Sequence, residues 1–246
     1  NALLGVVILA LGVPVFHLEA GNRCHDPLSP EEVNRKLIDH CADVHLCYTE
    51  HARRNLIAEG IPLHRIYVVG NPMREVLNYY GHPYLGNPHP ADPPYFLCTF
   101  HRQENVDRLS RLQALMENLV ALSNQYPTHR IIVSTHPRTA KQIAKSGIVE
   151  EWIPSQGDPK IEFRQPMGFK EFVALECRAD CILTDSGTVS EEACLIGRPC
   201  VILRDSTERP ETIETGNNIL SGLDAGSLCR SVALAKSQVE ISPTPL

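Results

Sequence analysis

The chain has 246 residues, of which 43% are hydrophobic and 21% are charged, and its formal net charge is -6. This composition is typical of a globular protein with one large domain or two modest ones, and it argues against disorder. The acidic balance argues against a nucleic-acid-binding surface, because binding to a phosphate backbone requires clustered Lys and Arg. Any anionic ligand must therefore be held by a local site.

Nine cysteines lie mostly inside apolar runs, without any C-x-x-C pair. This pattern favours reduced, buried thiols and hence a cytoplasmic protein. Residues 1–16 are nearly all apolar, but they lack the basic start of a signal peptide and are too few to span a bilayer, which takes ~20 residues. We expect a buried helix ending near Leu11, and no membrane partner. Because Asn1 falls inside a predicted element, we expect an incomplete N-terminal domain.

Short apolar strands alternate with amphipathic helices, which predicts an α/β fold with parallel sheets. Five prolines between residues 81 and 94 indicate a linker, because proline cannot donate a backbone hydrogen bond. The predicted domains are residues 1–88 and 89–246. Helices are expected at 30–41, 50–59 and from 109 onward. The predicted strands are Val13–Leu18, Val44–Tyr48, Ile66–Val69, Tyr95–Phe100, Ile131–Ser134, Cys181–Thr184, Cys200–Leu203 and Asn218–Leu220.

Two helix starts carry recognisable capping residues. Ser29 precedes Pro30, and Glu32 is spaced to complete a capping box with Ser29. Thr49 is the expected cap of the next helix, which Gly60 should end.

The strongest local motif is a strand that runs through Thr184-Asp185-Ser186-Gly187 into a helix, whose start is indicated by Thr188 and Glu191. Backbone N–H groups at such a helix start bind phosphate, and glycine allows close approach of the ligand. Ser186, Gly187 and Thr188 are therefore candidate phosphate-binding residues. A plain capped helix is the alternative interpretation.

Three further strand ends carry candidate ligand-binding residues. Arg209 follows the strand at 200–203 and offers bidentate donors to a diphosphate, although a solvated loop held by ion pairs would look the same. His101 and Arg102 follow the first strand after the linker, where His101 is suited to proton transfer or to binding phosphate oxygens. His136 follows the next strand and supports the same argument more weakly.

Two carboxylates on the N-terminal side are candidate acid/base groups. Glu19 lies at a strand end and Glu31 at a helix start, so the pair could move protons on opposite faces of a sugar ring. Glu31 has a simpler explanation, since acidic residues favour the first turn of any helix. The sequence contains no H-E-x-x-H, no paired-Cys spacing and no G-x-G-x-x-G, so neither a metal nor a nicotinamide cofactor is expected.

Six motifs, taken in order and spacing, resemble the UDP-N-acetylglucosamine 2-epimerase family over nearly the whole chain. They are His17-Leu18-Glu19-Ala20-Gly21, Pro30-Glu31-Glu32-Val33-Asn34-Arg35, Val69-Gly70-Asn71-Pro72, His101-Arg102-Gln103-Glu104-Asn105, Thr184-Asp185-Ser186-Gly187 and Glu208-Arg209-Pro210-Glu211.

The resemblance implies two Rossmann-like domains in the glycosyltransferase-B arrangement, with a UDP-sugar held mainly by the C-terminal domain. By matched position, Ser186 and Gly187 bind phosphate, Glu192 binds the ribose hydroxyls, and Arg209 and His101 meet the diphosphate. Glu19 and Glu31 are the acid/base carboxylates. The implied reaction, in the supply of surface polysaccharide precursors, is elimination of UDP and its re-addition after inversion of carbon 2. It needs no cofactor, and the family suggests a homodimer.

The chain lacks the family's upstream strands and a Gly-Asp-Thr-like turn with a further carboxylate, so the 246 residues alone are expected to be inactive or nearly so. Three alternatives stay open. The substrate could be of the UDP-N-acetyl-L-fucosamine type, because the sequence segments around Glu19, Thr49 and His101 resemble those of the enzymes that form this sugar nucleotide. The enzyme could be a hydrolysing relative, or the chain an inactive UDP-binding fragment.

Overall fold

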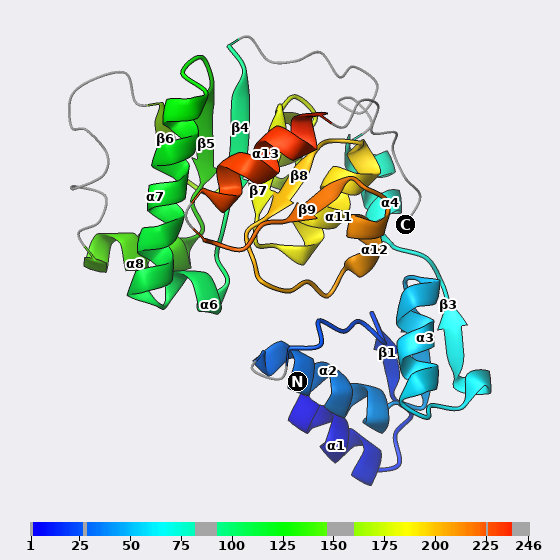
Figure 1. Cartoon of the computed structure of the whole chain (residues 1–246). Helices are drawn as coiled ribbons and strands as arrows, with labels where there is room; N and C mark the ends of the chain where they lie inside the picture. The colour runs from blue at the N-terminus through cyan, green and yellow to red at the C-terminus, as the bar shows by residue number, and fades with distance from the viewer. Residues whose placement is uncertain (1, 27–28, 82–92, 147–159, 225, 238–246) are drawn as a thin grey trace. The chain divides into compact units, whose positions relative to one another are not determined.

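The computed structural model describes residues 2–26, 29–81, 93–146, 160–224 and 226–237, which form two compact units (Figure 1). Unit 1 runs to Glu75 and also takes in Ser206–Glu211, while unit 2 comprises Val76–Asp205 and the chain from Thr212 onward. The predicted linker at 81–94 lies mostly outside the described residues, so the domain boundary near residue 88 stays a prediction.

Unit 1 contains a parallel sheet with strand order β1-β2-β3, in which His17 of β1 is paired with His45 of β2. Short helices connect and flank these strands. In chain order the elements are α1 (Ala2–Ala10), β1 (Phe16–Leu18), α2 (Pro30–Cys41), β2 (Val44–Cys47), α3 (Glu50–Ala58), η1 (Leu63–Arg65) and β3 (Ile66–Val68), followed across the boundary by α4 (Met73–Val76) and η2 (Leu77–Gly81).

Unit 2 contains a parallel sheet with strand order β6-β5-β4-β7-β8-β9. Helices alternate with its strands along the chain. The elements are β4 (Tyr95–Thr99), α6 (Gln103–Val106), α7 (Leu109–Gln125), β5 (Arg130–Ser134), α8 (Pro137–Ser146), β6 (Ile161–Arg164), α10 (Phe169–Glu176), β7 (Cys181–Thr184), α11 (Gly187–Ile196), β8 (Cys200–Ile202), β9 (Asn218–Leu220) and α13 (Ser227–Ser237). Between β8 and β9, helix α12 (Pro210–Glu214) begins in the segment assigned to unit 1 and ends in unit 2.

The α/β class with parallel sheets is confirmed, and every predicted strand is present. β1 begins at Phe16 rather than Val13, because Pro14 has no N–H to donate and the N–H of Val15 instead binds the Asp43 carboxylate at 2.9 Å. Strand β6 is present in addition to the predicted strands. Its residues alternate apolar and charged side chains and are only half-buried at the sheet edge, so they lack the continuous apolar run of the inner strands.

Alternate residues of the central strand β4 belong to two different apolar layers, one on each face of the sheet. Phe96 and Cys98 pack with the inner faces of α7 and α13, whereas Tyr95 and Leu97 pack with side chains of α10 and α11. The period of two follows from strand geometry, and it means that both faces of this sheet are covered. The sheet of unit 2 is therefore a rigid base for the loops at its ends.

Helix α1 differs from its predicted environment. It forms as expected, but Leu4, Val7 and Leu9 are 58%, 54% and 45% exposed, so it is not a buried helix in the described structure. Its main neighbour is α2, which it approaches through Gly5, where an added Cβ would come within 2.9 Å of Ile38. One neighbour cannot cover a helix that is apolar on all sides.

The two predicted caps of unit 1 have different outcomes. Thr49 caps α3 as expected, accepting a hydrogen bond from the N–H of Ala52 at 3.2 Å. Ser29 makes no side-chain capping bond, and the predicted capping box is wrong. Glu32 instead accepts from the N–H of Cys24 at 2.9 Å, because the incoming chain supplies a closer donor.

A buried ion cluster organises unit 1. The side chain of Arg23 is fully buried and binds Asp39 at 2.8 Å and Glu59 at 2.6 Å. Asp39 also binds His17 Nδ1 at 2.6 Å and the N–H of Gly21 at 3.2 Å. Burial opposes ionisation of Asp39, but its bonds to His17 and Arg23 prevail and lower its pKa. This cluster joins the end of β1 to α2 and α3.

Replacing Arg23 by Ala (R23A) should lower the free energy of unfolding of unit 1 by ~3–5 kcal/mol, because it removes the buried cation that pairs with both Asp39 and Glu59. Urea-dependent hydrogen exchange of the β2 amides measures this loss. R54A removes an exposed arginine of α3 and should cost under about 0.5 kcal/mol. Equal losses of stability in R23A and R54A would show that the buried ion pairs of Arg23 do not stabilise unit 1.

Candidate functional site

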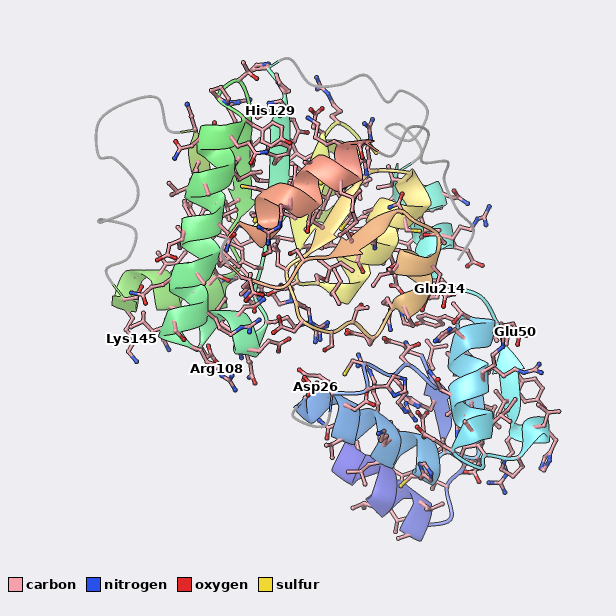
Figure 2. The ribbon with its side chains drawn as sticks, in the orientation of Figure 1. Asp26, Glu50, Arg108, His129, Lys145 and Glu214 are labelled. Carbon is pink, nitrogen blue, oxygen red and sulfur yellow. The ribbon has the colours of Figure 1, made fainter. Side chains whose placement is uncertain are left out.

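The strand order of unit 2 reverses between β4 and β7, since successive strands are added outward from β4 on both sides. In open parallel sheets of this kind, ligands bind at the carboxyl ends of the strands where the order reverses. Figure 2 labels Arg108, which directly precedes α7 at this end of the sheet, and His129, which follows α7 at the opposite end. The predicted residues His101 and Ser186 follow β4 and β7, so the topology brings them to the same edge.

The carboxylate of Asp185 ties the two loops together. It is fully buried and accepts hydrogen bonds from the N–H of His101 at 3.0 Å and of Arg102 at 2.9 Å. It also accepts from Nδ2 of Asn105 at 3.0 Å. A carboxylate that receives several N–H donors stabilises their arrangement strongly, so Asp185 fixes the path of the His101 loop.

A second set of bonds connects this loop to the end of β8. Asn105 Nδ2 also donates to the carbonyl of Leu203 at 2.9 Å, and Asn105 Oδ1 accepts from the guanidinium of Arg111 at 3.2 Å. Arg111 reaches Asp205 at 2.8 Å. The loops that follow β4, β7 and β8 are therefore held as one framework.

His101 is the titratable centre of this framework. Its ring packs against that of His136, with centroids 5.1 Å apart, and its Nδ1 lies 3.7 Å from Asp185. Burial lowers the pKa of His101 below the ordinary value of 6.5, and this effect outweighs the opposing effect of Asp185. His101 is thus mainly a neutral imidazole at pH 7.5, able both to donate and to accept a hydrogen bond.

Helix α11 begins at Gly187, two residues after Asp185. Ser186 caps it by accepting from the N–H of Val189 at 3.5 Å, so the helix starts one residue before Thr188, which the sequence had indicated as its start. Among the described residues, the backbone N–H groups of Gly187 and Thr188 donate to no protein acceptor, as expected in a first helical turn. Unbonded N–H groups at a helix start are the kind of donor that anions accept from in other proteins.

Glu192 lies one turn further along α11 and is 4% exposed. Burial raises its pKa to about 7, whereas a hydrogen bond with Glu176 lowers it and the nearby charge of Glu191 raises it. It can therefore change its ionisation state near neutral pH. An ionised carboxyl group can accept hydrogen bonds at both oxygens, whereas a protonated one has less acceptor capacity.

In unit 1, Glu19 and Arg209 are brought together. Glu19 follows β1 in a left-handed backbone conformation with φ of 69°, and its carboxylate binds Arg209 Nη2 and Asn22 Nδ2. Arg209 is nearly buried, and its segment packs with unit 1. An L-residue other than Gly, Asn or Asp rarely adopts positive φ, and such strain concentrates at functional sites.

Glu31 lies in the first turn of α2, where its carboxylate accepts from the hydroxyl of Ser29 at 3.2 Å. Four positions further on, Arg35 binds the buried carboxylate of Glu208 at 3.4 Å. The Glu31-to-Arg35 helix face and the 206–211 segment are thus connected within unit 1. No described interaction joins Glu31 to Glu19.

Sequence reasoning missed the residues that hold the candidates in place. Asp185, Asn105 and Arg111 lie within or near quoted motifs, but nothing in their spacing indicates that they bond to one another. Asp185 could have been identified as the acid directly after a buried strand, next to the capping serine. No local sequence pattern predicts the ion pairs of Glu208 with Arg35 and of Arg209 with Glu19, because each joins residues far apart in the chain.

The part of the chain that the structure describes contains no cluster of three His, Cys, Asp or Glu side chains arranged to hold a metal ion. Within the same residues, none of the helices combines the length and hydropathy that a bilayer crossing requires.

The chain is similar to known proteins over almost its whole length. The model of the UDP-N-acetylglucosamine 2-epimerase family matches residues 3–244. The chain belongs to this family. A UDP-N-acetylglucosamine 2-epimerase of Methanocaldococcus jannaschii is 39% identical over 95% of this chain and 66% of its own length. A Pseudomonas aeruginosa UDP-2,3-diacetamido-2,3-dideoxy-D-glucuronate 2-epimerase is 34% identical over 86% of this chain and 58% of its own length.

A crystal structure of the M. jannaschii enzyme in complex with UDP-GlcNAc and UDP superimposes with a TM-score of 0.89 at 37% identity, covering 98% of this chain and 67% of that one. The fold is therefore that of the family. The chain spans 66% and 58% of the lengths of the two curated relatives.

Replacing Asp185 by Asn (D185N) should lower the pKa of His101 further, because it removes the neighbouring charge that raises it. The same change leaves buried N–H donors poorly satisfied and should cost ~1–3 kcal/mol of stability. Proton NMR of the imidazole, assigned with H101Q, measures the pKa.

The matched control is D205N, an exposed acid on the neighbouring loop that binds Arg111. D205N should leave the pKa of His101 unchanged. A His101 pKa that is unchanged or higher in D185N would contradict the role given to Asp185.

Proposed function

We propose that this protein is a 2-epimerase of a UDP-linked N-acetylhexosamine, and that unit 2 binds the UDP moiety. One observation carries the proposal: Asp185 binds the His101 loop directly beside the first turn of α11, where the strand order reverses. Family membership supports it, as does the complex of the M. jannaschii relative with UDP-GlcNAc and UDP.

The proposed diphosphate site consists of backbone and side-chain donors. Gly187 and Thr188 provide N–H groups, and Ser186 and Thr188 provide hydroxyl groups, at the positive end of the α11 dipole. Arg102 adds a permanent positive charge and His136 a further ring nitrogen. A dianionic leaving group would favour the protonated form of His101, which would then donate a hydrogen bond to it.

Glu192 is proposed to accept the ribose hydroxyls from the same helix. Two vicinal hydroxyls match the two oxygens of one carboxylate. The nearly buried position of Glu192 strengthens such bonds, because few water molecules compete.

The proposed reaction uses the carboxylates of unit 1. One of Glu19 and Glu31 removes the proton from carbon 2 while the bond between carbon 1 and the UDP oxygen breaks, which leaves a 2-acetamidoglycal and UDP. A proton is then returned to the opposite face of carbon 2, and the UDP oxygen attacks carbon 1 again. No net electron transfer occurs, so the residues need to supply only proton transfer and stabilisation of the leaving group.

Glu19 is the better supported of the two carboxylates as an acid/base group. Arg209 and Asn22 hold its carboxylate in one orientation, and the strained backbone fixes its position. Fixed orientation of a proton-transfer group is what a general base requires. Glu31, in the first turn of α2, is proposed as its partner on the other face of the sugar. Arg209 is proposed to help bind the diphosphate.

The substrate is proposed to be UDP-GlcNAc or its 2-epimer. Product analysis in D₂O tests the reaction, using the protein expressed from its complete reading frame. We expect an intact UDP-sugar with inverted carbon 2 that carries deuterium. Release of free N-acetylmannosamine would identify a hydrolysing enzyme instead. Turnover of UDP-N-acetyl-L-fucosamine or its talose-type isomer, but not of UDP-GlcNAc, would overturn the substrate assignment.

In the same complete protein, Glu19→Gln should lower kcat by ~10²–10⁴-fold, because the amide cannot transfer a proton. UDP affinity should stay within about threefold, since unit 2 is proposed to hold the nucleotide. Steady-state kinetics and calorimetry with UDP separate the two effects. Glu50→Gln, on the exposed surface of α3, is the matched control and should behave as wild type. A mutant E19Q with wild-type kcat would exclude Glu19 from the chemistry.

A further inference from the structure

The last residue of α10 is a buried acid that the proposed mechanism does not use. Glu176 is fully buried, and neither of its carboxyl oxygens accepts a hydrogen bond from a donor in the described residues. Acidic side chains are almost never fully buried unless they are paired, because leaving a charge unsolvated costs several kcal/mol. Glu176 therefore requires a partner that is not a conventional hydrogen-bond donor.

The partner is a second acid, Glu192 of α11. The two helices pack on the same face of the sheet, where Leu175 of α10 and Ala193 of α11 belong to one apolar cluster. Within that layer the carboxyl groups of Glu176 and Glu192 lie within hydrogen-bonding reach of each other. Two ionised carboxylates only repel and accept, so this contact is stable only if the pair carries a proton.

Burial determines which acid keeps the proton. Burial, followed by the charge of Glu192, raises the pKa of Glu176 well above its ordinary value. Glu192 is slightly more open and ionises first, with a pKa of about 7. At neutral pH the pair thus consists of a neutral Glu176 and a Glu192 that is partly or fully ionised.

Other titratable and charged groups lie near this pair. Glu191, on the same helix, raises the pKa of Glu192. The thiols of Cys177 and Cys200 lie near Glu176, but burial raises the pKa of both, so they are neutral. Arg198 lies near enough to Cys177 to lower the pKa of that thiol.

We propose that Glu176 is a positioning residue for nucleotide binding: as a neutral acid it donates its O–H to one carboxylate oxygen of Glu192 and so holds that carboxylate in the orientation that accepts the ribose hydroxyls. This inference rests on the proposed function, in which Glu192 accepts those hydroxyls. It adds a buried donor behind the ribose site and makes recognition of the ribose dependent on pH.

The sign of the pH dependence follows from the pair. As pH falls through about 7, Glu192 takes up a proton and loses acceptor capacity, so the ribose contact weakens. The hydrogen bond from Glu176 opposes this protonation, because it stabilises the carboxylate. Removing the donor should move the midpoint of the change to higher pH.

The test compares UDP with 2′-deoxy-UDP by calorimetry between pH 5.5 and 8.5. Both ligands carry the same phosphates, so titration of the phosphates and of His101 cancels in the ratio of their affinities. In the wild-type chain this ratio should fall several-fold from pH 8 to pH 6, in step with the ionised fraction of a group whose pKa is about 7.

Two substitutions separate positioning from packing. Glu176→Leu fills the space without a donor, and it should reduce the preference for UDP several-fold at pH 7.5 and move the midpoint to higher pH. Glu176→Gln is the matched control, because its amide still donates to Glu192, and it should keep the wild-type midpoint. A Glu176→Leu chain with the wild-type preference at every pH would overturn the proposal.

A second measurement follows the protonation of Glu176 and Glu192 in the absence of any nucleotide. In ¹³C-glutamate-labelled protein, one carboxyl resonance should stay protonated above pH 7 and be lost in Glu176→Gln. If every glutamate titrates in the ordinary range near 4.5, the shared proton does not exist and the inference fails. If the wild-type chain binds no UDP while this resonance is present, the proposed function fails and the buried acid pair stands.

Discussion

The buried carboxylate of Asp185 is the interaction on which the candidate site depends. It gathers the N–H groups of His101 and Arg102 and the amide of Asn105, and Asn105 in turn reaches the carbonyl of Leu203. The ends of β4, β7 and β8 are thereby held as one surface beside the first turn of α11. The donors of the proposed diphosphate site are therefore already oriented, so little reorganisation should accompany binding.

Unit 1 uses a similar arrangement around Asp39. The carboxylate of Asp39 binds Arg23, His17 and the N–H of Gly21, two residues after Glu19. Gly21 has φ of 82°, and an added Cβ would lie 2.2 Å from the carbonyl oxygen of Ala52, so no larger residue fits there. The turn that carries Glu19 is therefore fixed by a buried charge network and a close backbone approach. In both units an acid that takes no part in the proposed chemistry determines where the candidate residues lie.

The sequence predicted those parts of the structure that local patterns encode. Apolar runs located eight of the strands, Thr49 identified a helix cap, and Gly60 follows the end of α3 in the left-handed conformation expected there. The predictions from the sequence failed where contacts between residues distant in the chain determine the structure. The amphipathic edge strand β6, the use of Glu32 by Cys24 and the exposure of α1 all depend on which neighbours are present. The candidate residues were predicted from motifs, whereas Asp185 and Glu176 emerged only from their burial and partners.

We propose above that the nucleotide diphosphate binds to unit 2 at the start of α11. Titration of the ¹⁵N-labelled chain with UDP, followed by backbone amide NMR, shows which residues the nucleotide contacts. The largest shifts should fall on Ser186, Gly187 and Thr188 and on the amides of the His101 loop. Binding of UDP that leaves these amides unmoved, with shifts elsewhere in the chain, would contradict it.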